Sequence, residues 1–250
     1  MKTVCVIPAR YASTRIPGKV LADICGRPMV WWVHRQAKEV KEFEKVIVAA
    51  DDIRTMDICK KYGIEAIMTS PNHEKHIDRL HEVSQKIKAD LYVCVCCDEP
   101  LVKPETISKV IPRDYSGGFF VQTLIREFDD PAEALDPSKM KVVANAKNEC
   151  LLITRSMAPF PYKSISFKFL KLIGIECFSR SALDFFVNRP TGFLEGIEEI
   201  TLLRYIENHK PVNLVLTTEN QIGVDTPKDL EKVREIIRLA VDRGEVDLSE

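Results

Sequence analysis

Short apolar runs alternate with amphipathic helical patterns along the first half of the chain. The apolar runs are too short for helices and lack polar alternation, which is typical of strands buried on both faces. Strands are predicted at 3–7, 45–50, 64–68 and 91–97, and helices near 28–40, 52–62 and 76–88. Strands that alternate with helices in this way predict a largely parallel sheet with helices on both faces.

The pattern changes after Pro112. Strand candidates then follow one another near 119–125, 141–145, 151–154, 170–178 and 212–216. They predict either a mixed continuation of the sheet or an antiparallel lobe packed on it. Thr226, Pro227 and Asp229 have the pattern of a helix start, so we expect a C-terminal helix from there.

The loop after the first strand collects positive charge. The strand is predicted to end at Pro8, and Gly18 would let the backbone approach a ligand closely. Arg10, Arg15 and Lys19 supply its cations, and Ser13 supplies a hydroxyl. Ligands of open α/β sheets bind beyond the carboxyl ends of strands, so the loop is predicted to hold a polyphosphate. The alternative is a solvated basic cluster; the spacing matches neither a P-loop nor a dinucleotide-binding motif.

Two aspartates are candidate magnesium ligands. Asp98 follows the buried run 91–97 and stands at another carboxyl end, where a carboxylate can bind the magnesium of a nucleoside triphosphate. The alternative role for Asp98 is to cap a turn. Asp225 precedes a helix start, so that it can cap the helix, bind the metal, or do both.

The helix predicted at 76–88 carries its apolar residues at helical spacing, which places Asp78 and Arg79 off the apolar stripe and, by default, in solvent. His76 at the start of this helix has the same solvated alternative. Cys96 lies two residues after Cys94 and is predicted on the same strand face, toward the site, where it can simply fill space.

Composition narrows the class of protein. The net charge of −1 gives no overall basic field, which argues against nucleic-acid binding. Several of the eight cysteines lie in apolar runs and no signal peptide is recognisable, so we expect reduced thiols and a cytoplasmic location. No second Cys or His group stands at zinc spacing from the cysteines at 94–97, so core packing is favoured over a metal there. No apolar segment reaches membrane-spanning length.

Motifs along nearly the whole chain resemble those of bacterial 3-deoxy-manno-octulosonate cytidylyltransferases, also called CMP-KDO synthetases, and more broadly of cytidylyltransferases that activate sugar acids. The motifs are Ile7–Lys19, Asp98–Pro100, Thr154-Arg155, Ile173–Ile175, Leu194-Glu195 and Gly223–Pro227. The resemblance implies a Rossmann-like nucleotidyltransferase fold over 1–250, with residues about 155–212 as a lobe for acceptor binding and dimerisation. It also implies a homodimer that transfers CMP from CTP to an acidic sugar and releases pyrophosphate.

The resemblance assigns roles to residues of this sequence. It implies Lys19, Arg10 and Asp98 in catalysis, and Mg²⁺ bound by Asp98 and Asp225. The nucleotide is assigned to Pro8, Ala9, Arg10, Ser13, Arg15, Lys19, Lys75 and Asp78. The acceptor is assigned to Arg79, Cys96, Arg155, Glu176, Glu198 and Thr201.

The sequence departs from the family pattern around the acceptor and near the base. The departing positions are Lys75, His76, Ile77, Cys96, Cys97, Leu172, Glu176, Phe178 and Thr201. Polyhydroxylated acceptors are recognised by buried hydrogen-bonding groups, so these changes predict an altered pocket. Two alternatives follow within the class: a relative that uses another anionic or amino-modified acceptor or another base, or a CMP-KDO synthetase with a rearranged pocket. A nucleotide-binding protein without turnover is the alternative from another class.

Overall fold

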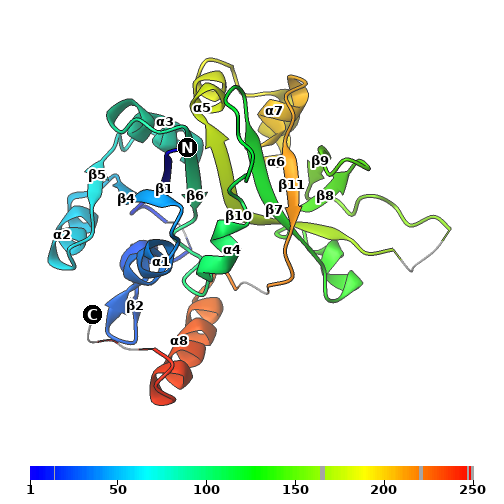
Figure 1. Cartoon of the computed structure of the whole chain (residues 1–250). Helices are drawn as coiled ribbons and strands as arrows, with labels where there is room; N and C mark the ends of the chain where they lie inside the picture. The colour runs from blue at the N-terminus through cyan, green and yellow to red at the C-terminus, as the bar shows by residue number, and fades with distance from the viewer. Residues whose placement is uncertain (14, 164–166, 220–221, 247, 249–250) are drawn as a thin grey trace.

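A single mixed sheet runs through the computed structural model, which describes residues 1–250 except 14, 164–166, 220–221, 247 and 249–250 (Figure 1). Thr14 of the basic loop therefore lies outside the described residues. The strand order is β11-β7-β10-β6-β1-β4-β5, with the β8–β9 hairpin attached beside β10. The strands are β1 (Thr3–Ala9), β4 (Phe43–Ala50), β5 (Ala66–Met68), β6 (Leu91–Val95), β7 (Val121–Glu127), β8 (Lys141–Ala144), β9 (Cys150–Thr154), β10 (Leu170–Ser179) and β11 (Asn213–Leu216). A separate small ribbon pairs β2 (Asp23–Ile24) with β3 (Arg27–Pro28).

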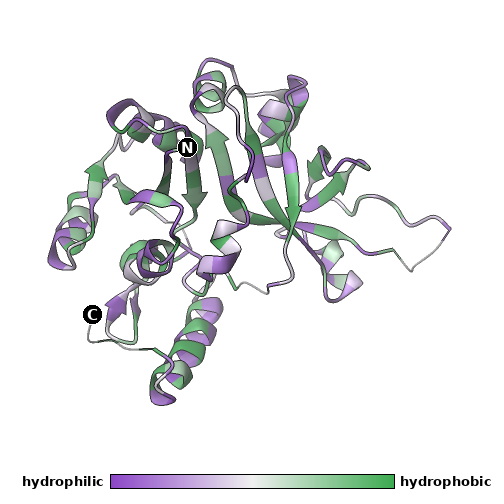
Figure 2. Ribbon diagram, viewed as in Figure 1, coloured by the Kyte–Doolittle hydropathy of each residue, from purple (hydrophilic) through white to green (hydrophobic). Residues whose placement is uncertain are grey.

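The helices cover both faces of this sheet, as predicted. One core lies under α1 (Met29–Lys38), α2 (Ile53–Lys61), α4 (Pro104–Ser108) and α8 (Pro227–Asp242). The other core lies under α3 (His76–Lys86), α5 (Arg180–Val187) and α7 (Leu203–Glu207). The remaining helical elements are η1 (Lys19–Leu21), η2 (Pro131–Leu135) and α6 (Phe193–Glu198). Figure 2 shows the hydrophobic residues gathered along the strands, which explains the apolar runs of the sequence.

The strand β10 makes the sheet mixed. It pairs antiparallel with β6 on one side and with β7 on the other, whereas the pairs β1–β4, β1–β6, β4–β5 and β7–β11 are parallel. Of the two predictions for the second half of the chain, the mixed continuation is therefore correct for β7, β10 and β11. The segment 155–212 contributes β10 to the centre of the sheet, and its role as an acceptor and dimerisation lobe stays a prediction.

Two predicted element ends near the site need correction, and a third is confirmed. β1 continues through Pro8 to Ala9, because in this parallel pair Pro8 still lies opposite Ala49 of β4. β6 ends at Val95, so that Cys96 and Cys97 belong to the turn that follows it. The predicted start of the C-terminal helix is confirmed: Thr226 is the N-cap of α8, and its hydroxyl accepts a hydrogen bond from the Asp229 N–H.

The eight cysteines all have free thiols. Among the described residues, no helix combines the length and the apolar character needed to cross a membrane.

Candidate active site

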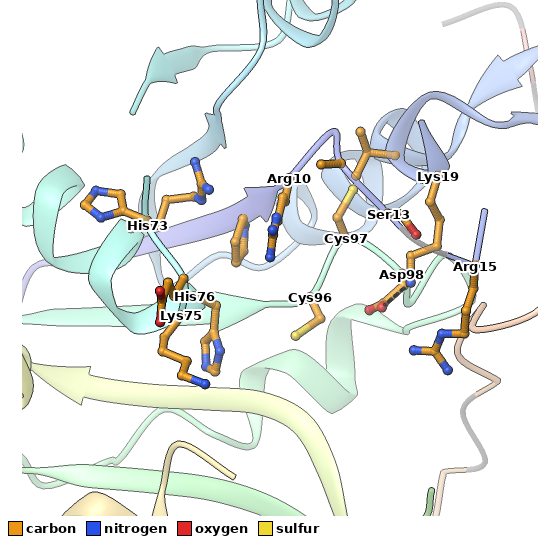
Figure 3. A pocket seen from close by; sticks show the side chains of 15 residues that line it. Arg10, Ser13, Arg15, Lys19, His73, Lys75, His76, Cys96, Cys97 and Asp98 are labelled. Carbon is orange, nitrogen blue, oxygen red and sulfur yellow. Dashed lines mark hydrogen bonds and ion pairs between the residues drawn. The ribbon is translucent and has the colours of Figure 1, made fainter. Parts of the chain in front are cut away.

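A basic cavity of ≈ 370 Å³ opens where β1 and β6 end, and we call it the first cavity. Figure 3 shows Arg15, Lys19 and Asp98 at one end of it and His73, Lys75 and His76 at the other. The cationic side chains in its lining are Arg10, Arg15, Lys19, Lys75 and Arg79, against the carboxylates of Glu74 and Asp98. This excess of fixed positive charge suits a polyanion.

Lys19 joins two carboxylates that are far apart in the sequence. Its Nζ lies 2.7 Å from Asp98 Oδ2 and 3.8 Å from Asp225 Oδ1. Arg15 Nη2 donates to Asp225 Oδ1 at 2.8 Å. The segments are also tied through their backbones, since the Val224 N–H donates to the Asp98 carbonyl and Lys19 Nζ to the Val224 carbonyl. The basic loop and both aspartates therefore converge at one point.

Asp225 is not the cap of α8. Thr226 and Asp229 cap that helix, whereas the Asp225 carboxylate faces Arg15 and Lys19. Of the roles that the sequence left open for Asp225, the helix cap is therefore wrong, and its side chain lines a neighbouring cavity described below rather than the first one.

The carboxylates around Lys19 fit magnesium, which prefers oxygen ligands. Beside Asp98, Glu99 is half-buried, and its buried Oε2 atom has no hydrogen-bond partner among the described residues. Burial raises the pKa of Glu99 to about 8, and the charges of Asp98 and Asp225 add to the effect. Gly223 leaves room for this carboxyl, because a Cβ there would lie 3.1 Å from Glu99 Oε1. Sequence analysis gave Glu99 no role, although its place next to Asp98 was a signal.

A buried ion pair holds the start of the basic loop. Arg79 donates to Asp51 Oδ2 at 3.1 Å, and Asp51 Oδ1 accepts the Tyr11 N–H at 2.8 Å. The expectation that Arg79 is solvated is therefore wrong: it is 2% exposed, because Asp51 compensates its charge. Asp51 was missed by sequence analysis, although it follows β4 as Asp98 follows β6.

Gly18 serves the loop differently from what we expected. Its φ of +64° lies in the left-handed region, and a Cβ there would lie 3.1 Å from the Tyr11 hydroxyl. The glycine thus allows the chain to turn closely against Tyr11 before Lys19. A side chain at this position would meet the Tyr11 ring and not a ligand.

The other predicted nucleotide residues take different positions. Pro8 and Ser13 line the first cavity, and Ser13 Oγ accepts the Ile16 N–H. Ala9 is buried in the core, so that only its backbone can contribute. Asp78 accepts the Lys75 N–H at 3.3 Å as part of the cap of α3, outside the cavity lining.

Three positions that depart from the family pattern come together beneath the start of α3. His76 Nε2 lies 2.7 Å from Glu176 Oε2, and Cys96 packs against Gly174 next to them. Although burial alone would lower it, the pKa of His76 is raised to about 9 by the Glu176 carboxylate. The solvated alternative for His76 is therefore wrong, because its ring is paired with Glu176 and only 28% of its side chain is exposed.

A second cavity of ≈ 650 Å³ adjoins the first and shares Arg15, Cys96 and Asp98 with it. Lys139, Lys171 and Lys232 join Arg15 as its cations, whereas carboxyl groups are more numerous in its lining: Asp98, Glu99, Asp129, Glu133, Asp136, Asp225 and Asp229. Lys171, on β10, has its pKa lowered by burial and by Arg126. Sequence analysis missed these lysines, because nothing in their local pattern marks a site.

The remaining predicted acceptor residues lie elsewhere. The Arg155 backbone N–H and the Thr154 hydroxyl donate to the Glu198 carboxylate, at 2.8 Å and 2.6 Å, and Arg155 Nε donates to the Glu198 carbonyl. Thr201 precedes α7. In the described part of the chain, neither cavity is lined by Arg155, Glu198 or Thr201. The role of these residues in binding the acceptor stays a prediction.

Comparisons with known proteins agree with this geometry. The model of the cytidylyltransferase family matches residues 4–214. A 3-deoxy-manno-octulosonate cytidylyltransferase of Escherichia coli is 37% identical over 238 residues, which cover 94% of this chain and 96% of that protein. The same enzyme of Parabacteroides distasonis is 37% identical over 244 residues, covering 93% and 96%.

Solved structures give the same answer. A CMP:2-keto-3-deoxy-manno-octonic acid synthetase complexed with CTP superposes with a TM-score of 0.91 at 36% identity, covering 96% of this chain and 99% of that one. An inositol-1-phosphate CTP transferase from T. maritima has a TM-score of 0.68 at 14% identity over 94% of each chain, which shows the shared fold alone. The chain therefore belongs to the cytidylyltransferase family, in the group of the 3-deoxy-manno-octulosonate cytidylyltransferases.

Proposed function

We propose that this chain transfers CMP from CTP to 3-deoxy-manno-octulosonate or a closely related acidic sugar, with release of pyrophosphate. The observation that carries the proposal is the meeting of two cavities at Arg15, Cys96 and Asp98. One cavity is basic enough for a triphosphate and the other can hold a second substrate. A reaction between two substrates needs such a shared boundary, because the reacting atoms must be held in contact.

The basic loop holds the triphosphate in this proposal. Arg10, Arg15 and Lys19 neutralise its phosphates, and Lys19 reaches the end of the cavity where Asp98 stands. Because the loop is fixed through Tyr11 and Asp51, its cations are oriented before the substrate arrives, which is how charged groups stabilise a transition state.

Asp98 and Asp225 would hold Mg²⁺, with Glu99 beside them. When bound, this ion supplies positive charge at the α-phosphate and the leaving pyrophosphate. An oxygen of the acceptor, held in the second cavity, attacks the α-phosphorus in line with the leaving pyrophosphate. Lys139 and Lys171 lie where an acidic acceptor can pair its carboxylate with a cation.

A second candidate is the same reaction with a different acceptor. It is favoured by the cluster of His76, Cys96 and Glu176 near the shared boundary, since these groups replace the usual family residues with an ion pair and a thiol. Sites that recognise buried hydrogen-bonding groups discriminate strongly between acceptors, so this change can redirect the specificity.

The active form is proposed to be a cytoplasmic homodimer. Large apolar side chains are exposed at two places, Phe160 and Tyr162 on the loop after β9 and Phe193 and Ile197 on α6, and exposed apolar surface can serve a protein contact. Eight free thiols favour a reducing compartment. Light scattering of the purified protein would reveal the dimer, and a monomer at all concentrations would contradict it.

The test of the function is pyrophosphate release. Purified protein with CTP and 3-deoxy-manno-octulosonate should release pyrophosphate only when Mg²⁺ is present, and more slowly with UTP or GTP. A panel of other sugar acids separates the two candidates. If no acceptor supports release while CTP still binds, the chain is a nucleotide-binding protein and not an enzyme.

Lys19→Met ties this activity to the basic loop. We expect kcat/KM to fall by about 10²–10³-fold, the usual effect of removing one oriented charge from a transition state. The exposed Lys228 on α8 gives the matched control, and Lys228→Met should keep wild-type rates. Equal rates for the two variants would contradict the assignment.

A further inference from the structure

Three metal-ligating side chains meet behind the first cavity, each from a different element. They are His76 at the start of α3, Cys94 in β6 and Glu176 in β10. One nitrogen, one sulfur and one oxygen from these residues lie within 4.8 Å of one another. This cluster is separate from the carboxylates around Lys19.

The sheet itself positions two of the three groups. Glu176 lies directly opposite Cys94 in the antiparallel pair of β10 and β6, so both side chains extend from the same face. The register of β10 against β7 shifts between Ile173 and Glu176, a bulge of the kind that redirects side chains near functional sites. α3 packs on this face through Ile77 and brings His76 over the pair.

The cluster is buried but can be reached. Cys94 is fully buried and Glu176 is 5% exposed, whereas His76 lines the first cavity. Cys96, two residues after Cys94, lines both cavities. An ion can therefore enter from the cavity side past His76 and Cys96, and its remaining coordination position would face the cavity.

The donor types select the metal. An imidazole, a thiolate and a carboxylate are ligands of zinc and similar borderline divalent ions, while magnesium takes oxygen donors. Three protein ligands with one open position are also the arrangement of zinc sites that bind a further molecule.

We propose that His76, Cys94 and Glu176 form a second metal site, selective for a Zn²⁺-type ion, whose open position faces the first cavity. The ion would join α3 to β6 and β10, so its binding stabilises the fold as well as placing a cation beside the substrates. The site would thus be distinct in chemistry and in place from the proposed magnesium site.

Cobalt is the probe, because Co²⁺ replaces zinc and absorbs light. Chelator-treated protein, kept reduced, should bind one equivalent of Co²⁺ and show visible d–d bands together with a near-ultraviolet thiolate-to-cobalt band. Zn²⁺ should remove both signals, excess Mg²⁺ should not, and Zn²⁺ should raise the midpoint of thermal unfolding.

Variants locate the site. Cys94→Ser should lose the thiolate band, and Glu176→Gln, which keeps the side-chain shape, should weaken Co²⁺ binding at least about tenfold. Cys177→Ser, at a buried cysteine that packs in the other core, and Asp98→Asn, at the proposed magnesium site, should leave the band unchanged. A wild-type protein without a thiolate band, or a band that survives both Cys94→Ser and Glu176→Gln, overturns the proposal and leaves His76 and Glu176 as an ion pair only.

Discussion

At the scale of single residues, the contacts of Asp225 decide between capping α8 and binding a ligand, two roles that the sequence left open. Its carboxylate faces Arg15 and Lys19, and the cap of α8 belongs to Thr226. The two neighbouring residues should therefore respond differently to substitution.

Asp225→Asn should reduce pyrophosphate release by about tenfold or more while changing the free energy of unfolding by less than about 0.5 kcal/mol, as is usual for exposed side chains. Thr226→Ala should instead lose about 1 kcal/mol of stability, the typical contribution of an N-cap. Steady-state rates and urea unfolding of both variants provide the comparison. A large loss of stability in Asp225→Asn would return Asp225 to the role of a cap.

The sequence predicted the residues of the site that follow directly from strand ends. Lys19 and Asp98 were predicted because a buried strand places the next residues at the ligand edge of a parallel sheet. Arg79 was predicted in solvent, since helical spacing shows only which residues are apolar and cannot reveal that Asp51, 28 positions away, compensates a buried charge.

At the scale of the elements, α1 carries a histidine that makes stability depend on pH. Burial, with a smaller contribution from Lys38, lowers the pKa of His34 from 6.5 to about 4. Between these two pH values the unfolded chain binds a proton at His34 that the folded chain does not. The contribution of His34 to the free energy of unfolding is therefore fully present above pH 6.5 and is lost as the pH falls toward 4.

The wild-type protein should therefore lose about 2 kcal/mol more than His34→Gln between about pH 7.5 and about pH 5, measured by urea unfolding at each pH. The glutamine cannot titrate, which makes it the matched reference. Parallel losses in the two proteins would show that His34 is not responsible.

α6 and α7 are joined by a buried ion pair. Arg204 Nε lies 2.6 Å from Glu195 Oε2, and both side chains are less than a tenth exposed. Arg204→Met should cost about 3–5 kcal/mol, because it leaves the Glu195 charge buried without a partner. The double variant with Glu195→Leu should recover a large part of this loss in chemical unfolding. If the double variant is no more stable than the single one, the pair is not what holds these helices.

The periodicity of the sequence predicted the type of most elements but not their order in the sheet. β10 reads as a strand, yet its insertion between β6 and β7 in the opposite direction depends on tertiary packing that no local pattern records. The same insertion brings Glu176 opposite Cys94, which is why the spacing of cysteines and histidines gave no sign of the cluster described above.

At the scale of the whole molecule, two cavities meet at one shared boundary beside the sheet. The sequence predicted the basic cavity, since its cations lie in one short loop, whereas the second cavity is assembled from η2, β10 and the start of α8. The long-range ties from Lys19 to Asp98 and Val224 hold the parts of this boundary in register.

The most direct measurement is a crystal structure with CTP and Mn²⁺, whose anomalous scattering marks the ion that replaces Mg²⁺. We expect an anomalous peak in contact with Asp98, Asp225 and a phosphate oxygen, with the triphosphate lying in the first cavity against Arg15 and Lys19. A triphosphate bound outside that cavity, or manganese away from both aspartates, would contradict the account.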